Sequence, residues 1–211
     1  MGLFFYTKKG SIISTVDLPT TEIIEPVNLA RYEEIMKITV YLGSRFGNDP
    51  IYKEMVVKLG HWLVSQNHQL VYGGSKDGLM GCLADTVLAD GGEVYGVIPL
   101  DFQKREKAHL HLTDLTLVAD MDERKRMLMD KGDVLLALPG GPGTLEEIVQ
   151  AFSWARVGLH HKPCLFLNIN GYYNPLIELF DKMVSADFIS QEVRDKAIFV
   201  NNLKELEAVL K

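Results

Sequence analysis

The segment Pro139-Gly-Gly-Pro-Gly-Thr-Leu-Glu-Glu147 joins a glycine turn to two acidic residues, and the basic pair Arg124-Lys125 lies upstream of it. Glycine lets the backbone approach a ligand closely, and the N-terminus of a following helix offers unpaired N–H groups to an anion. A carboxylate can polarise water, and a guanidinium holds phosphate or ribose oxygens with a planar fork of donors. These residue types therefore indicate chemistry on a small phosphate-bearing ligand.

Glycine turns also follow two earlier strand-like runs, at Gly43–Gly47 and Gly73–Gly78. Ligands of open parallel sheets bind outside the carboxyl ends of the strands, so three turns on one edge predict a nucleotide site. We expect Ser44 to form a hydrogen bond with the ligand and Gly74 to lie against it. The P-loop pattern is absent, and Glu146 occupies the third glycine position of the dinucleotide pattern. A mononucleotide is the remaining ligand.

The PGGxGTxxE motif, with Met121-Asp-Glu-Arg-Lys-Arg-Met127 before it, resembles the LOG family of cytokinin riboside 5′-monophosphate phosphoribohydrolases. Gly73–Gly81 and Lys162–Asn174 extend the resemblance, which covers the chain from about Lys37 to its end. It implies hydrolysis of the base–ribose bond of a purine or cytokinin nucleoside 5′-monophosphate. It also implies a homodimer that needs no cofactor and no metal.

The resemblance assigns Arg124 and Glu147 as the catalytic pair. Its implied contacts to the nucleotide are Glu106, Lys125, Gly140, Gly141, Pro142, Gly143, Thr144, Leu145, Glu146 and Ser153. Two positions depart from the family pattern: Asp122 stands where His is common, and Ser153 stands where plant members carry Thr. Asp122 is expected to affect which substrate is used more than which reaction is catalysed. Ser153 keeps the hydroxyl group of the threonine that it replaces.

The expected chemistry agrees with these residue types. Cleavage of a glycosidic bond passes through an oxocarbenium-like state, which a carboxylate such as Glu147 can stabilise while it polarises the attacking water. Arg124 can hold phosphate or ribose oxygens and orient Glu147. The N–H groups of the turn would bind the 5′-phosphate.

Structural interpretations stand beside the catalytic ones. Thr144-Leu-Glu-Glu147 also fits a capping box, in which Thr144 would cap a helix and Glu147 would bond back to the cap. Arg126 is expected on a solvated helix face, and Glu146 is also compatible with a solvated or structural role. His109 and His111 alternate as strand residues do, but no partner sits at metal-ligand spacing.

Two other functions are compatible with this sequence. One is a non-catalytic carrier or sensor of an AMP-type nucleotide on the same fold. The other is a lysine decarboxylase, which would need a lysine that forms a Schiff base with pyridoxal phosphate. No segment recommends a lysine for that role.

The elements that must position these residues alternate between strand and helix from about Ile38 onward. Strands are expected at 38–42, 69–72, 93–98, 115–118, 133–138, 163–167 and 198–200, and helices at about 50–63, 79–89, 121–131, 144–156, 175–184 and 203–210. This alternation predicts an α/β fold with a Rossmann-like open parallel sheet and helices on both faces, as a single domain over residues 37–211. Residues 1–36 are predicted to be an arm with a possible hairpin and a linker.

Bulk composition limits the function classes. The chain of 211 residues is 47% hydrophobic and 24% charged, which suits one soluble globular domain. A net charge of -6 argues against binding nucleic acid or an anionic membrane. Cys82 and Cys164 cannot form a disulfide framework, and no apolar run suits a signal peptide or a membrane span. A cytoplasmic location follows as the expectation.

Overall fold

The computed structural model describes residues 35–103 and 108–211. The predicted arm over residues 1–36, with its possible hairpin, therefore lies almost wholly outside the described residues. Glu106, a predicted contact to the nucleotide, also lies outside them.

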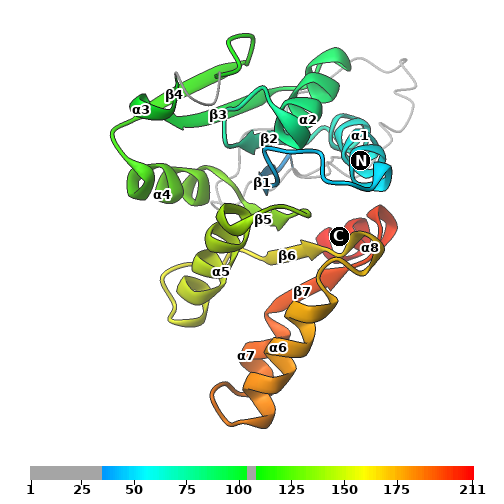
Figure 1. The fold of residues 1–211 in the computed structure, drawn as a ribbon, viewed down its shortest axis with the longest axis vertical. Helices are drawn as coiled ribbons and strands as arrows, with labels where there is room; N and C mark the ends of the chain where they lie inside the picture. Colours follow the sequence, from blue (N-terminus) through cyan, green and yellow to red (C-terminus); the bar gives the residue numbers. More distant parts are fainter. Residues whose placement is uncertain (1–34, 104–107) are drawn as a thin grey trace, which may run out of the picture. The chain divides into compact units, whose positions relative to one another are not determined.

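Seven strands of the described chain form one parallel sheet in the order β4-β3-β2-β1-β5-β6-β7 (Figure 1). They are β1 (Lys37–Tyr41), β2 (Gln69–Tyr72), β3 (Val94–Pro99), β4 (Asp114–Val118), β5 (Val134–Ala137), β6 (Cys164–Leu167) and β7 (Ala197–Val200). Every neighbouring pair runs parallel. All four residues of β5 and of β6 are buried, as expected for strands covered on both faces. The predicted open parallel sheet is confirmed.

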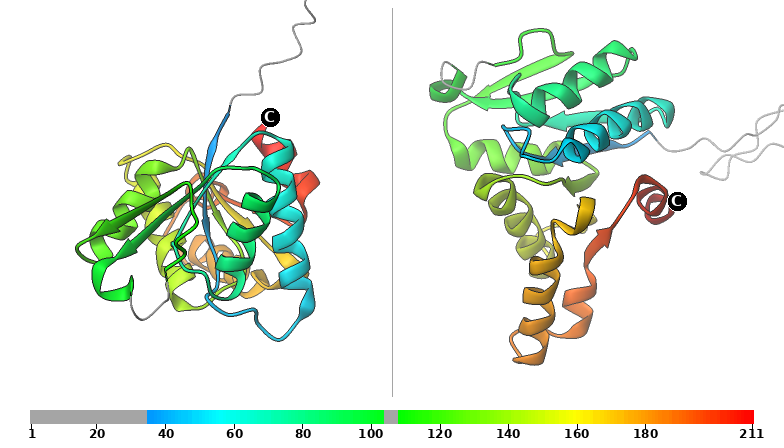
Figure 2. Two further views of the ribbon diagram at one scale, coloured as in Figure 1. Left: turned by 90° about the horizontal axis from the view of Figure 1, so that it is seen from above. Right: turned by 45° about the vertical axis from the view of Figure 1, so that its right-hand side comes forward.

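Helices cover both faces of this sheet (Figure 2). They are α1 (Pro50–Ser65), α2 (Gly78–Ala89), α3 (Leu100–Gln103), α4 (Met121–Lys131), α5 (Pro142–Arg156), α6 (Asn174–Ser185), α7 (Gln191–Asp195) and α8 (Leu203–Leu210), with a 3-10 turn η1 (Ile169–Gly171). One apolar core joins α1, α2 and α8 to the sheet, and a second joins α4, α5, α6 and α7 to its other face. The predicted single α/β domain thus has two cores, one on each side of the sheet.

Local signals explain where several elements begin. Asp49 caps α1, because its side chain accepts a hydrogen bond from the N–H of Ile51, and Pro50 occupies the first turn. Asp120 caps α4 in the same way through the N–H of Glu123. The short elements α3, α7 and η1 were not predicted, since segments of three to five residues are too short to show an apolar period.

The order of the strands places a crevice beside β1. From β1 the chain winds outward through β2, β3 and β4, and then returns to place β5 on the other side of β1. The connections that leave β1 and β5 therefore diverge, which is the arrangement where open α/β sheets bind ligands. The turns Gly43–Gly47 and Pro139–Gly143 follow these two strands.

Two further sequence expectations can be compared with the described residues. Both cysteines are free thiols, Cys164 within β6 and Cys82 within α2. Among residues 35–103 and 108–211, no helix is both long and apolar enough to cross a membrane.

Candidate active site

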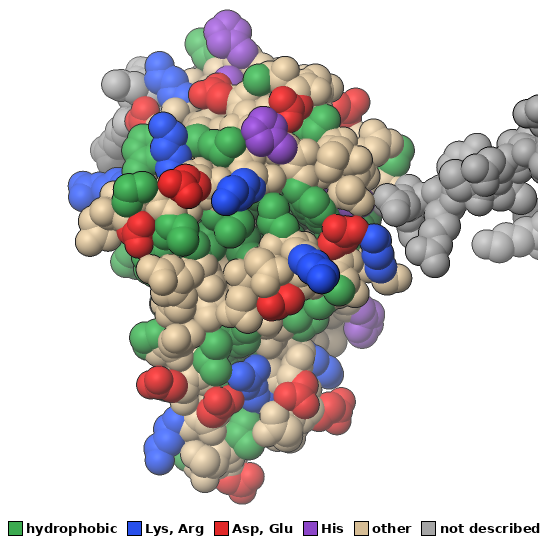
Figure 3. Space-filling view, turned by 90° about the vertical axis from the view of Figure 1, so that its right-hand side faces the viewer, with side chains coloured by type: hydrophobic (Ala, Val, Ile, Leu, Met, Phe, Trp, Pro, Cys, Tyr) green, Lys and Arg blue, Asp and Glu red, His purple; other side chains and the backbone are tan. Residues whose placement is uncertain are grey.

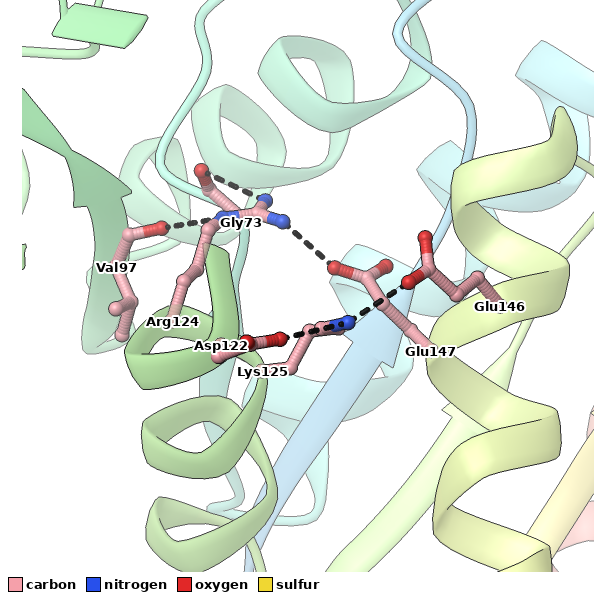
Figure 4. A network of polar contacts seen from close by, with 7 residues as sticks. All are labelled: Gly73, Val97, Asp122, Arg124, Lys125, Glu146 and Glu147. Carbon is pink, nitrogen blue, oxygen red and sulfur yellow. Dashed lines mark hydrogen bonds and ion pairs between the residues drawn. The ribbon is translucent and has the colours of Figure 1, made fainter. Parts of the chain in front are cut away.

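Arg124 is a buried cation held from three sides. It lies on α4 with 8% of its surface exposed. Its Nε donates to the carbonyl of Val97 at 3.0 Å, its Nη2 donates to the carbonyl of Gly73 at 3.3 Å, and its Nη1 donates to Oε1 of Glu147 at 2.7 Å (Figure 4). The guanidinium therefore has a fixed position between two strand ends and α5.

Glycine at position 73 is what leaves room for this side chain. A Cβ atom added there would lie 2.2 Å from Nη2 of Arg124, closer than any non-bonded contact allows. Gly73 directly follows β2, and the arginine that needs the space beside it lies on α4, 51 residues later. Gly73 does not have a positive φ, so glycine is needed here for the space it leaves to Arg124 and not for its backbone conformation.

Glu147 faces Arg124 from the second turn of α5. The side chains of the two residues are 11% and 10% exposed. The capping-box interpretation of Thr144 is wrong: α5 begins at Pro142 with Gly141 as its N-cap, so Thr144 already lies inside the helix. The helix starts three residues earlier than a Thr144 cap requires, at Pro142 instead of Leu145, because proline favours the first helical position. This start directs the carboxylate of Glu147 to the guanidinium.

A second ion pair lies beside the first. Nζ of Lys125 lies 2.7 Å from a carboxylate oxygen of Glu146 and 3.3 Å from one of Asp122 (Figure 4). The hydrogen bond to Glu146 raises the pKa of Lys125 above its usual value. Glu146 and Asp122 are largely exposed, with side-chain exposures of 58% and 82%, so this pair lies nearer to water than the Arg124–Glu147 pair. Arg126 is exposed, as predicted.

A cavity of about 240 Å³ opens beside the Arg124–Glu147 pair. We call it the polar cavity; its lining includes Arg124, Glu147, Glu146, Ser44, Gly73, Tyr41 and the start of α5 from Gly141 to Thr144. Burial, and secondarily the negative charge of Glu147, raise the pKa of Tyr41 well above its usual value. Its phenol therefore stays protonated over the whole physiological pH range.

The start of α5 gives the polar cavity an anion-binding wall. The first turn of α5 contains no acidic residue, and Gly141 has no side chain to cap the helix. The first N–H groups of a helix carry partial positive charge and favour an anion. A Cβ atom added at Gly141 or Gly143 would meet nothing within 4 Å, so both glycines border open space. This wall has the chemistry to hold a phosphate.

Comparison with known proteins identifies the chain's relatives. It is 42% identical over 170 residues to a cytokinin riboside 5′-monophosphate phosphoribohydrolase of Arabidopsis thaliana, covering 81% of this chain and 80% of the relative. It is 38% identical over 175 residues to the phosphoribohydrolase of the same name from Rhodococcoides fascians, covering 82% and 88%. The chain belongs to the LOG family. Residues 80–210 also match a family model described as possible lysine decarboxylase.

The fold of this LOG-family chain is shared more widely than its sequence. The molybdenum cofactor carrier protein of Chlamydomonas reinhardtii superposes with a TM-score of 0.62 at 18% identity, over 83% of this chain and 96% of that protein. At this identity the likeness shows the fold alone.

The structure brings together most of the residues that the LOG resemblance and the glycine turns single out. Those that line the polar cavity are Ser44, Arg124, Gly141, Pro142, Gly143, Thr144, Glu146 and Glu147. Gly140 and Leu145 line neighbouring hollows that share Gly141 and Pro142 with it. Lys125 lies next to them through its bond to Glu146.

Two expected residues lie elsewhere. Gly74 packs against Ile98 and Leu115, and its carbonyl accepts the N–H of His109 at 2.9 Å, so Gly73 lines the polar cavity in its place. Ser153 lies eleven residues after Pro142, about 16 Å farther along α5, and is not among the residues lining the cavity.

Two tyrosines that the sequence did not single out hold the glycine turn in place. The hydroxyl of Tyr172 donates to the carbonyl of Gly140 at 2.5 Å, and that of Tyr173 donates to the carbonyl of Leu138 at 2.7 Å. Both follow β6, in a segment that carried the family resemblance without a role for either tyrosine. Satisfying these carbonyls fixes the turn that precedes α5.

The histidines serve structural contacts. Nε2 of His109 lies 2.9 Å from a carboxylate oxygen of Asp85, and Nε2 of His160 lies 2.9 Å from the carbonyl oxygen of Ala151. The part of the chain that the structure describes holds no group of three or more His, Cys, Asp or Glu residues suited to a metal ion.

Proposed function

We propose that this protein hydrolyses the N-glycosidic bond of a purine or cytokinin nucleoside 5′-monophosphate and releases the free base and ribose 5-phosphate. The observation that carries the proposal is the buried Arg124–Glu147 pair in the lining of a cavity that the start of α5 also lines. The names of relatives at about 40% identity support the same reaction.

The start of α5 positions the substrate. The 5′-phosphate takes the open space beside Gly141 and Gly143, where the helix N-terminus attracts its charge. This places the ribose in the polar cavity, near Glu147. Fixing the sugar relative to a catalytic carboxylate lowers the entropy cost of the reaction.

Glu147 acts on the water and on the developing charge. As the bond between C1′ and the base nitrogen breaks, the carboxylate stabilises the oxocarbenium-like sugar and accepts a proton from the attacking water. The water oxygen bonds to C1′, the base leaves with the electron pair of the broken bond, and the proton that Glu147 took from the water passes to the base nitrogen. The products are ribose 5-phosphate and the free base, and the carboxylate is restored when it returns its proton.

Arg124 orients the carboxylate. Its bonds to the carbonyls of Val97 and Gly73 leave Nη1 directed at Oε1 of Glu147. Because the planar guanidinium is held in place by three hydrogen bonds, the carboxylate of Glu147 that it binds keeps one orientation toward C1′. Its remaining N–H groups are able to bind ribose or phosphate oxygens.

The proposal includes a homodimer that needs no metal, as the LOG resemblance implies, and a cytoplasmic protein that does not bind nucleic acid, as the composition indicates. The face of the molecule seen in Figure 3 supports the last point, because Lys and Arg side chains there alternate with Asp and Glu rather than forming a basic area. The net charge of -6 adds to this support.

A decarboxylase dependent on pyridoxal phosphate fits the site poorly. Such an enzyme needs a lysine amine at the reacting position. None of the described residues that line the polar cavity is a lysine, and the neighbouring Lys125 is bound to two carboxylates. No step through that cofactor follows from this arrangement.

The test is a product assay with AMP, GMP, CMP and an N6-substituted AMP. We expect free base and ribose 5-phosphate to appear in equal amounts from the purine nucleotides. Thermal stabilisation by AMP is measured on the same preparation. Stabilisation without release of base from any nucleotide would contradict the proposal and indicate a nucleotide carrier.

A further inference from the structure

The peptide group that joins Gly140 to Gly141 leads from the glycine turn into α5. Its carbonyl oxygen, which belongs to Gly140, accepts a hydrogen bond from the hydroxyl of Tyr172 at 2.5 Å. This peptide bond is trans, and in a trans peptide the C=O and the N–H point to opposite sides. The N–H of Gly141 therefore points away from Tyr172.

The side of this peptide away from Tyr172 is the side of the polar cavity. Gly141 lines that cavity, whereas Tyr172 lines the two neighbouring hollows and is not among the residues that line the polar cavity. A hydrogen bond needs a donor that points nearly straight at its acceptor. The direction of this peptide thus decides whether the N–H of Gly141 can bind an anion in the polar cavity.

The local sequence leaves this peptide free to rotate. It has glycine on both sides, and glycine gives the backbone more conformational freedom than any other residue. Gly140 packs closely, since a Cβ atom there would lie 2.2 Å from Oγ1 of Thr144, but Gly141 borders open space. Among residues 35–103 and 108–211, Tyr172 is the residue whose hydrogen bond selects one direction of the peptide.

The position of Tyr172 is itself fixed by amide side chains. Oδ1 of Asn168, a residue that is only 5% exposed, accepts the N–H of Tyr173 at 2.7 Å, which fixes the peptide that follows Tyr172. Asn170 has a left-handed φ of +51°, and its Nδ2 donates to Oδ2 of Asp49 at 3.2 Å. The segment that carries Tyr172 is thus joined both to the end of β6 and to the cap of α1.

The adjacent Tyr173 makes a similar hydrogen bond with a different consequence. Tyr173 is buried, and its hydroxyl donates to the carbonyl of Leu138 at 2.7 Å. The next residue is Pro139, whose nitrogen carries no hydrogen. The bond from Tyr173 therefore satisfies a buried carbonyl without directing an N–H group, whereas the bond from Tyr172 directs one.

We infer that Tyr172 is a positioning residue, whose hydroxyl directs the N–H of Gly141 into the polar cavity to bind a phosphate ester. The inference deepens the proposed function and rests on it for the identity of the ligand. Tyr172 acts through the Gly140–Gly141 peptide and not by touching the phosphate. Loss of its hydroxyl should therefore weaken every ligand with a 5′-phosphate to the same extent, whatever base the ligand carries.

The test is Tyr172→Phe in the full chain, which removes the hydroxyl and keeps the ring. Calorimetry measures the affinity for ribose 5-phosphate and for AMP. A misdirected N–H loses one hydrogen bond to a charged group, so we expect both affinities to fall by about tenfold. The KM for AMP should rise by about the same factor with little change in kcat, because the phosphate is bound equally in the substrate complex and in the transition state.

Two further variants make the test specific. Tyr95→Phe is the matched control, because it removes a hydroxyl bound to Glu93 at 2.8 Å, and Tyr95 is not among the residues that line the polar cavity. It should leave both affinities unchanged. Tyr173→Phe leaves a buried carbonyl without its donor, so it should lower the melting temperature more than Tyr172→Phe does.

Unchanged affinity of Tyr172→Phe for ribose 5-phosphate would overturn the inference. A loss for AMP alone would also overturn it, because it would indicate a direct contact with the base. If Tyr172→Phe lowers the melting temperature as much as Tyr173→Phe, the role of Tyr172 is purely structural and the inference fails.

Release of base, assayed on the same preparations, separates this inference from the proposed function. Binding of AMP that weakens in Tyr172→Phe, without release of base by the wild type, contradicts the reaction and supports the positioning role. Release of base by the wild type, with unchanged ligand affinities in Tyr172→Phe, contradicts the positioning role and supports the reaction.

Discussion

Nη1 of Arg124 lies 2.7 Å from Oε1 of Glu147, and neither side chain exposes more than 11% of its surface. The two residues come from α4 and α5, which precede and follow the buried strand β5. Removing one partner from such a pair leaves a buried charge without compensation. Stability and catalysis are therefore linked at this contact.

Replacement of Arg124 by Ala should destabilise the protein. The change removes the buried guanidinium that binds Glu147 and donates to Val97 and Gly73, for an expected loss of about 3–5 kcal/mol in the free energy of unfolding. Denaturant titration measures this loss. The control Arg126→Ala removes an exposed cation from the same helix and should change stability by less than about 0.5 kcal/mol. Equal effects of the two changes would contradict the structural role of Arg124.

Replacing Gly141 and Gly73 by alanine should have different effects, the first mainly on ligand binding and the second on stability. Gly141→Ala places a methyl group in open space but gives α5 a poorer N-cap, so we expect a loss of stability of at most about 1 kcal/mol, together with loss of the stabilisation that ribose 5-phosphate gives the wild type. Gly73→Ala places a methyl group against Arg124 and should lower the melting temperature without any ligand. Thermal unfolding with and without ribose 5-phosphate measures both. Full stabilisation of Gly141→Ala by ribose 5-phosphate would show that the phosphate binds elsewhere.

Much of the fold could be predicted from the sequence, because the signals are local. The predicted helix 121–131 and the predicted strand 69–72 have the bounds of α4 and β2. The strand expected at 133–138 is apolar after Asp133, and β5, which lies within it, is fully buried. These elements depend on the order of apolar residues and on the caps beside them, both of which a single sequence displays.

The site was only partly predictable, because its details depend on contacts between distant residues. Arg124 and Glu147 were found through the motif, yet only the start of α5 at Pro142 shows that Thr144 is not a cap. Gly73, and not the predicted Gly74, lies at the site because it contacts the side chain of Arg124, which is 51 residues away in the sequence. No local sequence pattern predicts that the hydroxyl of Tyr172 donates to the carbonyl of Gly140, 32 residues earlier.

Alkaline pH should weaken the contribution of Lys125 to stability. Its hydrogen bond to Glu146 raises the pKa of Lys125 in the folded state. The contribution is therefore complete below the unfolded pKa of about 10.4 and disappears as the pH rises through the folded value. Lys125→Met should be less stable than the wild type near neutral pH, by less than about 1 kcal/mol because the pair is partly exposed. Denaturant titration across pH should show this difference shrinking at alkaline pH; a constant difference would contradict the assignment.

The most direct measurement of the central claim is the release of free base from AMP by Glu147→Gln, compared with Glu146→Gln and the wild type. Glutamine keeps the shape of the side chain but cannot accept a proton, so base release should fall by about 10²- to 10⁴-fold while AMP still binds. Glu146→Gln, whose carboxylate is exposed and bound to Lys125, should keep most of its activity. Undiminished release by Glu147→Gln would contradict the assignment of this carboxylate to catalysis.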